Sequence, residues 1–426
     1  MPTKVVIIGG SVGGVSTAVA LRKAGCDVTV LERAATIVAT TGAGLGLDPK
    51  TCAALTRLGL RDIFEECSQP IPIEEYRWID HATKSAISLI KNDKHLHRSM
   101  HWSDLHRLLI QALPEGAVNF SHKVVLLQQS ESGVTITAET PNGEKKYHGD
   151  IVIAADGVGS FARKQLVPGD ERRYAGMVAW RGVCDGNAHP ELLAELKADF
   201  KTLGDGIIFD IADRCMNLIY MIPGNRINWL WYRDAPEPKL GSHSVTIRPT
   251  TEDMQKLYRD AENTWTPAFV KLIKTSKAPF MNVIYDKDPI TQWVFGRVAL
   301  MGEAAHPTTP HGSRSTNMSI QDADCLGRCF EAQPHDPVAA LHKYAEERIR
   351  QTTKEVLFSR HVGEVRQGHW FDPVKFDWPS QTPQIKSLLL NGKQTEPDYK
   401  KCATELLGNI QTIGKGQSVL ATDREQ

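Results

Sequence analysis

Glycines and an acidic residue near the start of the chain have the types and spacing of a dinucleotide cradle. The glycines follow the apolar run of residues 5–8, and Glu32 ends the next apolar run roughly 20 residues later, where this motif places it. Glycines let the backbone approach a pyrophosphate, the N-terminus of the following helix offers N–H groups, and a carboxylate accepts hydrogen bonds from ribose hydroxyls. The residues expected to form the cradle are Gly9, Ser11, Val12, Gly13, Gly14, Glu32 and Arg33.

Two further stretches place a carboxylate after an apolar run. Asp156 follows the run at residues 150–154, and Glu303 follows the run at residues 298–301. A carboxylate at the end of a strand can accept hydrogen bonds from ribityl hydroxyls. The N-terminus of the helix beyond the second stretch can stabilise a flavin pyrimidine ring, which becomes anionic on reduction. This chemistry suits a flavin dinucleotide.

The elements that must position these residues follow from apolar periodicity and turn residues. Helices are expected at residues 49–58, ended by Gly59, and at residues 102–109, with Ser103 as the N-cap. Strands are expected at residues 134–137, 150–154, 206–209, 217–220, 228–232 and 298–301.

The length of the chain and its aromatic, β-like central region predict two domains. A chain of 426 residues exceeds the size at which one core keeps growing. The predicted fold class is α/β, with a Rossmann-type FAD-binding domain, an inserted β-rich substrate domain and a C-terminal helical or irregular tail. The expected limits are 1–73, 99–180 and 286–360 for the FAD-binding domain, 74–98 and 181–285 for the substrate domain, and 361–426 for the extension.

Charge and composition argue against several classes of protein. Fifty Lys and Arg residues balance fifty Asp and Glu residues, so no charge excess favours nucleic acid or an anionic membrane. No apolar run reaches the ~20 residues of a membrane helix, and no secretory signal pattern occurs. The eight cysteines show no C-x-x-C pair and no zinc spacing, which favours a cytoplasmic location and no metal. Cys325 and Cys329, four residues apart, are interpreted as packing on one helix face.

Together these motifs resemble the FAD-dependent aromatic hydroxylases, the single-component flavoprotein monooxygenases of the para-hydroxybenzoate hydroxylase type. The resemblance covers about residues 4–360. The family's G-D-A-A-H motif is matched by residues 302–306, with Glu303 in place of aspartate, and Ser315 stands where glycine is usual. The D-G-x-x-S-x-x-R motif is complete as Asp156, Gly157, Ser160 and Arg163, and Pro310, Gly312, Asn317 and Asp322 follow at the family's intervals.

The resemblance implies FAD as the bound cofactor and NADH or NADPH as a transient co-substrate. It also implies a reaction in which reduced flavin and O2 form a C4a-hydroperoxide, whose terminal oxygen is transferred to an electron-rich aromatic ring. Carried over residue by residue, the further cofactor-binding positions are Gly44, Leu45, Gly46, Trp102, Asp156, Gly157, Arg163, Gly302, Glu303, Pro310, Gly312, Ser315, Thr316, Asn317 and Met318.

Within this family, residues 174–183 and 228–233 look closest to the 2,6-dihydroxypyridine 3-monooxygenase branch. The expected substrate is therefore a small hydroxylated aromatic or pyridine-like compound. His311, Pro310 and Arg314 are candidate catalytic residues, although a solvated arginine at a helix start explains Arg314 equally well. The residues expected to bind substrate are Trp180, Arg181, Tyr220, Trp229, Trp231 and His311, and strand alternation makes about half of the strand aromatics ordinary core.

Two other functions remain open at this point. The chain could be a flavin oxidase or reductase that transfers no oxygen. It could also be an FAD-binding redox sensor or scaffold, an interpretation motivated by the departures from the family pattern at Ser11, Trp102, Glu303 and Ser315. A homodimer is a further expectation, with residues 361–426 as a cap or an oligomer contact.

Overall fold

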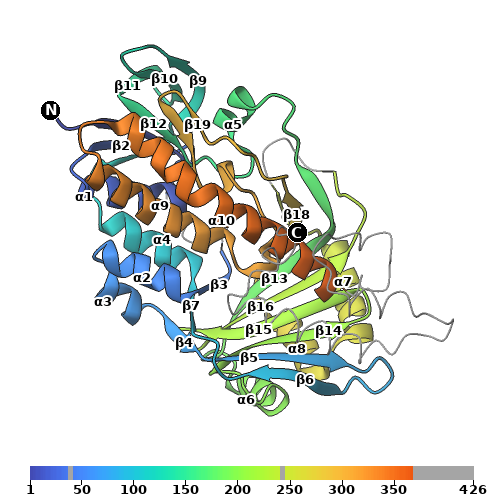
Figure 1. Cartoon of the computed structure of the whole chain (residues 1–426). Helices are drawn as coiled ribbons and strands as arrows, with labels where there is room; N and C mark the ends of the chain where they lie inside the picture. The colour runs from blue at the N-terminus through green and yellow to red at the C-terminus, as the bar shows by residue number, and fades with distance from the viewer. Residues whose placement is uncertain (37–41, 240–244, 368–426) are drawn as a thin grey trace, which may run out of the picture. The chain divides into compact units, whose positions relative to one another are not determined.

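The computed structural model describes residues 1–36, 42–239 and 245–367, and the chain divides into two compact units (Figure 1). Unit 1 comprises Met1–Pro70, Leu96–Ala175 and Ile284–Arg360. Unit 2 comprises Ile71–His95, Gly176–Val283 and the residues from His361 onward. The limits of the two units lie close to the expected domain boundaries. The assignment of one domain to FAD and the other to substrate stays a prediction.

Unit 1 is built around a six-stranded sheet. Its central strand pairs in parallel on both sides, so that Val6 lies opposite Thr29 and Val152. A parallel strand buried on both faces needs a continuous apolar run, which residues 5–8 supply. The strand order is β19 (Val294–Phe295), β20 (Val298–Leu300), β12 (Ile151–Ala154), β1 (Lys4–Ile8), β2 (Asp27–Leu31) and β8 (Val118–Asn119), with only β19 antiparallel to its neighbour.

Helices pack on this sheet and on one another. α1 (Val12–Lys23) packs against α9 (Ser315–Ala332), where a Cβ on Gly327 would lie 3.1 Å from the Cβ of Ala20. Strands and helices in this arrangement confirm the predicted α/β class. The other helices of the chain's N-terminal and C-terminal parts are α2 (Pro49–Arg57), α3 (Arg61–Glu66), α4 (Trp102–Gln111), α5 (Phe161–Leu166) and α10 (Pro337–Arg366).

The other strands of Unit 1 form two three-stranded sheets. The antiparallel pair of β3 with β7 places Gly46 opposite Ser99, and β3 carries part of the expected flavin loop. One sheet has the order β11 (Gly143–Gly149), β10 (Val134–Thr140) and β9 (Lys123–Gln129), and the other has β3 (Gly44–Leu47), β7 (His97–His101) and β4 (Gln69–Ile71).

Unit 2 contains an eight-stranded, mostly antiparallel sheet, as the β-rich prediction required. The strands expected at residues 206–209, 217–220 and 228–232 are confirmed and lie side by side in it (Figure 1). The order is β17 (Thr246–Ile247), β18 (Phe280–Asp286), β13 (Arg173–Asp185), β16 (Arg226–Asp234), β15 (Cys215–Ile222), β14 (Gly206–Ala212), β5 (Ile73–Ile79) and β6 (Ala86–Asn92).

Three helices that the sequence analysis did not identify pack within Unit 2. They are α6 (Pro190–Asp199), α7 (Thr251–Thr264) and α8 (Pro267–Thr275). Local signals for them exist: α7 begins with a capping box of Thr250 and Asp253, and α6 and α8 each begin with proline. Their apolar residues pack against one face of the sheet in a single core cluster.

The ends of two predicted helices test the local reasoning. α2 is confirmed: Asp48 caps it by accepting a hydrogen bond from the Thr51 N–H at 2.7 Å, and Gly59 follows with φ +82°. The N-cap prediction for α4 is wrong, because the ring of His101 accepts from the Ser103 N–H at 3.2 Å instead. The histidine ring thus accepts a hydrogen bond from a backbone N–H at the helix start, which is the role that was expected of the serine hydroxyl.

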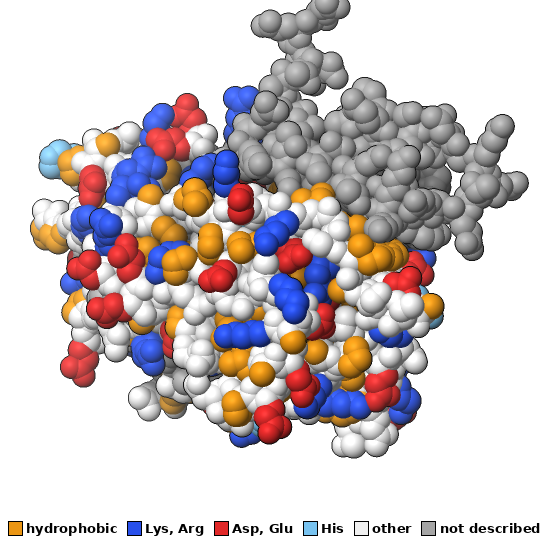
Figure 2. Space-filling view, turned by 90° about the horizontal axis from the view of Figure 1, so that it is seen from below, with side chains coloured by type: hydrophobic (Ala, Val, Ile, Leu, Met, Phe, Trp, Pro, Cys, Tyr) orange, Lys and Arg blue, Asp and Glu red, His pale blue; other side chains and the backbone are white. Residues whose placement is uncertain are grey.

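The expected limit between residues 360 and 361 is also the position at which Unit 1 ends and Unit 2 resumes. α10 continues without a break to Arg366, so the expected limit between residues 360 and 361 falls within a helix. The expected tail beyond residue 367 lies outside the described residues. In the described part of the chain, no helix is both long and apolar enough to cross a membrane. Acidic and basic side chains intermingle over the face shown in Figure 2.

Candidate active site

The turn between β1 and α1 is one that only glycine can form. Gly9 has φ +103° and its N–H donates to the carbonyl oxygen of Leu31 at 2.8 Å. A Cβ on Gly14 would lie 1.9 Å from the Gly9 carbonyl oxygen, which no side chain tolerates. The predicted tight glycine turn is therefore confirmed, and it brings the start of α1 against the end of β1.

The N-terminus of α1 is open to an anion. Ser11 is the N-cap, yet its side chain makes no capping hydrogen bond, and the first turn of α1 contains no acidic residue. The first N–H groups of a helix have no partner within the helix and lie at the positive end of its dipole. These groups suit a pyrophosphate.

Glu32 is held in place by the backbone of the cradle. Its Oε2 accepts from the Gly10 N–H at 2.6 Å and its Oε1 accepts from the Ala34 N–H at 2.8 Å. A carboxylate offers about four acceptor positions, so the positions left beside these two bonds can accept ribose hydroxyls. The cradle thus fixes the carboxylate without using up its acceptors.

His106 supports the same cradle, and the sequence analysis missed it. Its Nε2 donates to the Gly10 carbonyl oxygen at 2.6 Å, and the Trp102 ring stacks on it with centroids 4.8 Å apart. Burial lowers the pKa of His106. A histidine on the buried face of α4 is the only local signal for it, and histidines in such positions usually serve packing.

Asn317 joins the two loops that were expected to hold the flavin ring. Its Nδ2 donates to the carbonyl oxygens of Gly46 in β3 and Ser313 before α9, at 2.8 and 2.5 Å. Its Oδ1 accepts from the Asp48 N–H at 3.0 Å. Residues 44–48 and 313–317 are therefore neighbours in space, although about 270 positions separate them in the sequence.

Arg314 lies between carboxylates in this region. Its Nε is 2.9 Å from Glu355 Oε2 on α10, and its Nη1 is 3.4 Å from Asp48 Oδ2. Asp48 is buried and also caps α2, so the sequence analysis, which did not select it, missed a residue that connects α2 to the loop before α9. The catalytic role of Arg314 stays a prediction.

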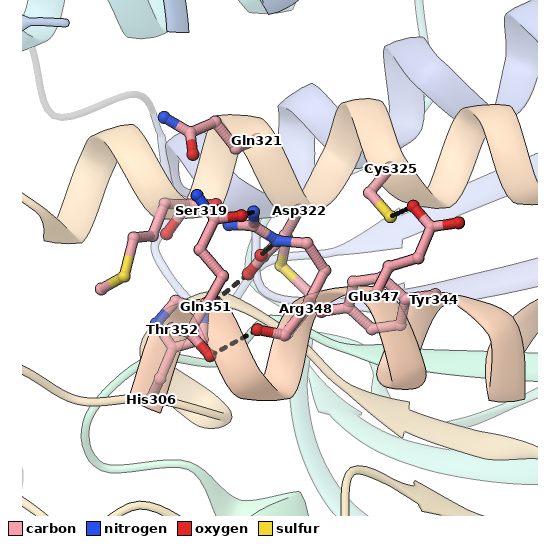
Figure 3. Close-up of polar contacts among 12 residues, drawn as sticks. His306, Ser319, Gln321, Asp322, Cys325, Tyr344, Glu347, Arg348, Gln351 and Thr352 are labelled. Atoms are coloured by element: carbon pink, nitrogen blue, oxygen red, sulfur yellow. Dashed lines mark hydrogen bonds and ion pairs between the residues drawn. The ribbon is translucent and has the colours of Figure 1, made fainter. Parts of the chain in front are cut away.

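A buried charged network holds the Gly302 turn (Figure 3). Asp322 on α9 is fully buried and accepts from the Gly302 N–H at 3.0 Å, from His306 Nε2 at 2.6 Å and from Arg348 Nε at 2.7 Å. Burial alone would raise the pKa of the Asp322 carboxyl, but His306 and Arg348 outweigh burial and lower it to about 2. Asp322 is therefore an anion that positions the turn, in which Gly302 has φ +58°. No local signal identifies Arg348, since it lies on another helix.

Asp156 and Arg163, both predicted to bind FAD, are engaged within the protein. Asp156 accepts from Ser160 Oγ at 2.5 Å and from the Phe161 N–H at 2.7 Å, at the start of α5. Arg163 is fully buried, pairs with Asp170 through two hydrogen bonds and donates to the Ala305 carbonyl oxygen at 2.7 Å. These contacts brace α5 against the turn that follows β20, and contacts of either side chain with FAD stay predictions.

The other candidates near the flavin loops lie in short helical turns. Glu303 is half-buried in the turn Gly302–Ala304, and His311 is buried in the turn Pro310–Gly312. A Cβ on Gly312 would lie 2.5 Å from Ser359 Oγ, so glycine allows this turn to approach α10. The catalytic roles of Pro310 and His311 stay predictions.

The predicted substrate residues of Unit 2 lie on opposite faces of its sheet. Directly paired residues on neighbouring strands share a face. Trp180, Trp229 and Trp231 lie on the face covered by α6–α8 and are at most 5% exposed within the core cluster there. Arg181 pairs with Leu230, and Tyr220 pairs with Asn228, which places both on the other face. The three tryptophans therefore fit the packing interpretation, and Arg181 and Tyr220 are the remaining candidates.

Arg181 has a buried donor that no described residue satisfies. Its Nε is buried and has no hydrogen-bond partner within residues 1–36, 42–239 and 245–367. Burial raises the pKa of Tyr220 and of Tyr232, and the charge of Arg181 acts in the opposite direction on both. The two phenols are therefore neutral hydrogen-bond donors at physiological pH beside a cation.

An aromatic and charged cluster on the same face was also missed. Tyr76 stacks on Phe209 with centroids 4.8 Å apart, and the guanidinium carbon of Arg366 lies 4.2 Å from the Phe209 centroid. Arg366 hydrogen bonds to the Tyr76 hydroxyl, which in turn donates to Glu74 at 2.8 Å. Arg366 comes from the end of α10, so only the tertiary structure brings it here.

Comparisons with known proteins agree with this geometry. The family described as "FAD binding domain" matches residues 2–359. A 3-amino-4-hydroxybenzoate 2-monooxygenase of Streptomyces platensis is 29% identical, covering 84% of this chain and 87% of the relative. A 6-hydroxynicotinate 3-monooxygenase of Pseudomonas fluorescens is 26% identical, covering 90% of this chain and 98% of the relative. The solved structure of 2,6-dihydroxypyridine-3-hydroxylase from Arthrobacter nicotinovorans superposes with a TM-score of 0.74 at 24% identity, covering 86% of this chain and 93% of that one.

Proposed function

The chain belongs to the FAD binding domain family, and on that premise we propose that, as an FAD-dependent monooxygenase, it hydroxylates a small hydroxylated aromatic or pyridine-like compound. The substrates named for the two relatives are rings that carry a hydroxyl and a carboxylate, as a benzoate or a nicotinate. Both relatives are named as monooxygenases that act at a numbered ring position, 2 in the first and 3 in the second. The proposal extends that reaction class to this chain and leaves the ring type to experiment.

The residues of the cradle fit FAD. A Cβ on Gly9 would lie 2.4 Å from the Ala155 carbonyl oxygen, so glycine lets this turn pack against the backbone that follows β12. The N–H groups at the start of α1 would hold the pyrophosphate, and Glu32 would hold the adenosine ribose. The loops joined by Asn317 would hold the flavin ring. Bound FAD supplies the redox chemistry: it accepts a hydride from NADH or NADPH and activates O2.

The buried, unpaired Nε of half-buried Arg181 is the observation that carries the substrate proposal. A buried donor without an acceptor costs free energy unless a ligand supplies the acceptor. A phenolate or a ring carboxylate is an acceptor of the right charge, and the neutral phenol of Tyr220 can donate a second hydrogen bond to it. Binding the ionised form keeps electron density in the ring, which favours attack by the ring on an electrophilic oxygen. Arg181 would thus orient the ring and hold its anionic form.

The test is nucleotide oxidation by FAD-loaded protein with a panel of hydroxybenzoates, hydroxynicotinates and dihydroxypyridines. We expect one class to accelerate NADH or NADPH oxidation and to gain one oxygen atom from isotopically labelled O2, with little peroxide. Labelled oxygen absent from every product, together with peroxide equal to the nucleotide consumed, would establish the oxidase alternative. Arg181→Gln is expected to raise KM for the accepted compound, whereas Arg181→Lys is expected to raise it less.

We also propose a cytoplasmic location, O2 as co-substrate and a homodimer. A cytoplasmic location is supported by the seven cysteines in the described residues, all of which are free thiols. O2 as co-substrate follows from the reaction class. The homodimer is carried over from the sequence-based expectation, and the oligomeric state in solution tests it.

A further inference from the structure

Two cysteines and a glutamate from two helices meet in Unit 1. Figure 3 shows two of them, Cys325 and Glu347. Cys325 and Cys329 lie one turn apart on α9, and Glu347 reaches them from α10. The two Sγ atoms and a Glu347 oxygen all lie within 4.8 Å of one another. The Cys325 thiol already donates to Glu347 Oε2 at 3.4 Å. Among the described residues, this is the one group of His, Cys, Asp or Glu side chains that lie close enough together to hold a metal ion.

We propose that Cys325, Cys329 and Glu347 bind a thiophilic divalent cation of the zinc class, with water as the fourth ligand. Tetrahedral zinc with Zn–S bonds of about 2.3 Å and Zn–O bonds of about 2.1 Å separates its ligand atoms by about 3.6–3.8 Å. The observed spacing reaches this value with small side-chain rotations. Both thiols bind as thiolates, so binding releases two protons to solvent.

A disulfide is a poorer use of the same pair. Side chains at positions i and i+4 of a helix have Cβ atoms about 5–6 Å apart. A disulfide needs about 3.5–4.5 Å between Cβ atoms, so the backbone of α9 would have to distort to form one. A cation between the sulfurs needs no such change.

The surroundings permit entry from one side. Cys325 and Cys329 are 1% and 3% exposed, so the cysteine side of the site is closed to solvent. The Glu347 side chain is 36% exposed and pairs loosely with Arg328, whose Nη2 lies 3.6 Å from it. Arg328 is 49% exposed and has a second partner in Asp324, so it can leave Glu347 without losing all of its ion pairs. Glu347 would then turn from the arginine to the cation.

The test uses the full-length, FAD-loaded chain with Cys26, Cys52, Cys67 and Cys402 changed to Ser, which removes the half-buried thiols and the thiol beyond the described residues. Cd2+ is added as the probe, and the ultraviolet charge-transfer band of thiolate-bound cadmium is followed. We expect one equivalent to bind, Zn2+ to displace it, and Zn2+ to raise the midpoint of thermal unfolding because it joins α9 to α10.

Variants decide which residues are ligands. Cys329→Ala is expected to abolish the band, and Glu347→Gln to keep the band but weaken Cd2+ binding at least about tenfold. Glu346→Gln, on the exposed neighbour whose side chain is 72% exposed, is the matched control and should change nothing. Failure of the parent protein to bind one equivalent, or equal binding by Glu347→Gln, overturns the proposal. Glu347→Gln decides the matter even where Cys329→Ala fails to fold. None of these readouts depends on the proposed substrate.

Discussion

At the scale of single residues, charged side chains in Unit 1 act mainly by fixing the backbone around the cofactor motifs. Asp322 fixes the Gly302 turn, Arg163 binds the carbonyl oxygens that follow it, and Glu32 fixes Gly10. Each is buried or partly buried, where an unpaired charge costs several kcal/mol. Their substitution should therefore affect stability and cofactor retention together.

Asp322→Asn should destabilise the fold and change its acid sensitivity. Losing the anion leaves Arg348 buried without its counter-charge, which costs about 3 kcal/mol at neutral pH. Because the folded-state pKa of Asp322 is lowered from 3.8 to about 2, this group contributes stability above pH ~4 that is lost as the pH falls toward 2. That contribution is about 2 kcal/mol.

Urea unfolding of both proteins between pH 5 and pH 2 checks this prediction. The difference in unfolding free energy between the wild type and Asp322→Asn should shrink as the pH falls, because the wild type loses the contribution of ionised Asp322. The other carboxyl groups titrate in both proteins, so their effect cancels in the difference. A difference that stays constant over this range would show that Asp322 is not ionised in the way the network requires.

Glu303→Asp tests the carry-over from the family motif. The family places aspartate here. The shorter side chain of Glu303→Asp would return the carboxylate to the distance from the backbone that the family has, so FAD retention should be maintained or improved. Fluorescence titration of the apoprotein with FAD measures it, with Glu331→Asp at the exposed end of α9 as a control. A sharp loss of FAD affinity in Glu303→Asp would mean that the site is built around glutamate.

At the scale of elements, the glycine turn and the α1–α9 packing set the position of the cradle. Gly9, Gly14 and Gly327 each stand where a Cβ would approach another chain segment too closely. Such positions are decided by hard-sphere contacts and leave little room for adjustment. The elements cannot move apart without opening the core of Unit 1.

Gly14→Ala should abolish FAD binding. The added Cβ would lie 1.9 Å from the Gly9 carbonyl oxygen, so α1 must shift away from β1. Gly159→Ala is the matched control, because no atom lies within 4 Å of its added Cβ. FAD content after purification and far-ultraviolet circular dichroism separate loss of the cradle from global unfolding. Equal FAD content in the two variants would contradict the role given to this turn.

At the scale of the whole molecule, the chain forms two units, and in Unit 2 the two faces of the sheet carry different kinds of residue. The helix-covered face carries the large aromatic core, in which Trp229 donates its Nε1–H to Ser276 at 2.7 Å. The other face carries Arg181, Tyr220 and the Arg366 cluster. Stability and substrate recognition should therefore respond to different substitutions.

Trp229→Phe and Arg181→Gln are expected to separate these effects. Trp229→Phe removes a buried hydrogen bond and leaves a cavity, which should lower the unfolding free energy by about 2–3 kcal/mol with little change in KM. Arg181→Gln should raise KM at least about tenfold, because a charge-assisted bond worth about 1.5–3 kcal/mol is lost. Urea unfolding and steady-state kinetics with the accepted compound measure both. A raised KM in Trp229→Phe alone would return the tryptophan to the substrate site.

The sequence by itself determined what depends on neighbours in the chain. The glycine turn, the capped helix α2, the central strands and the order of the three motifs follow from backbone sterics, side-chain periodicity and the caps that nearby residues provide. The α/β class followed from the same local rules. These rules act within a few residues, so they can be read before the fold is known.

Only the tertiary structure decided which distant side chains meet. It paired Asp322 with Arg348, joined Gly46 to Asn317, brought Glu347 to Cys325 and Cys329, and put the three tryptophans on the core face. The period of a strand shows that alternate residues share a face, but not which face is covered. Partners from separate helices carry no local signal, because their contact depends on how whole elements pack.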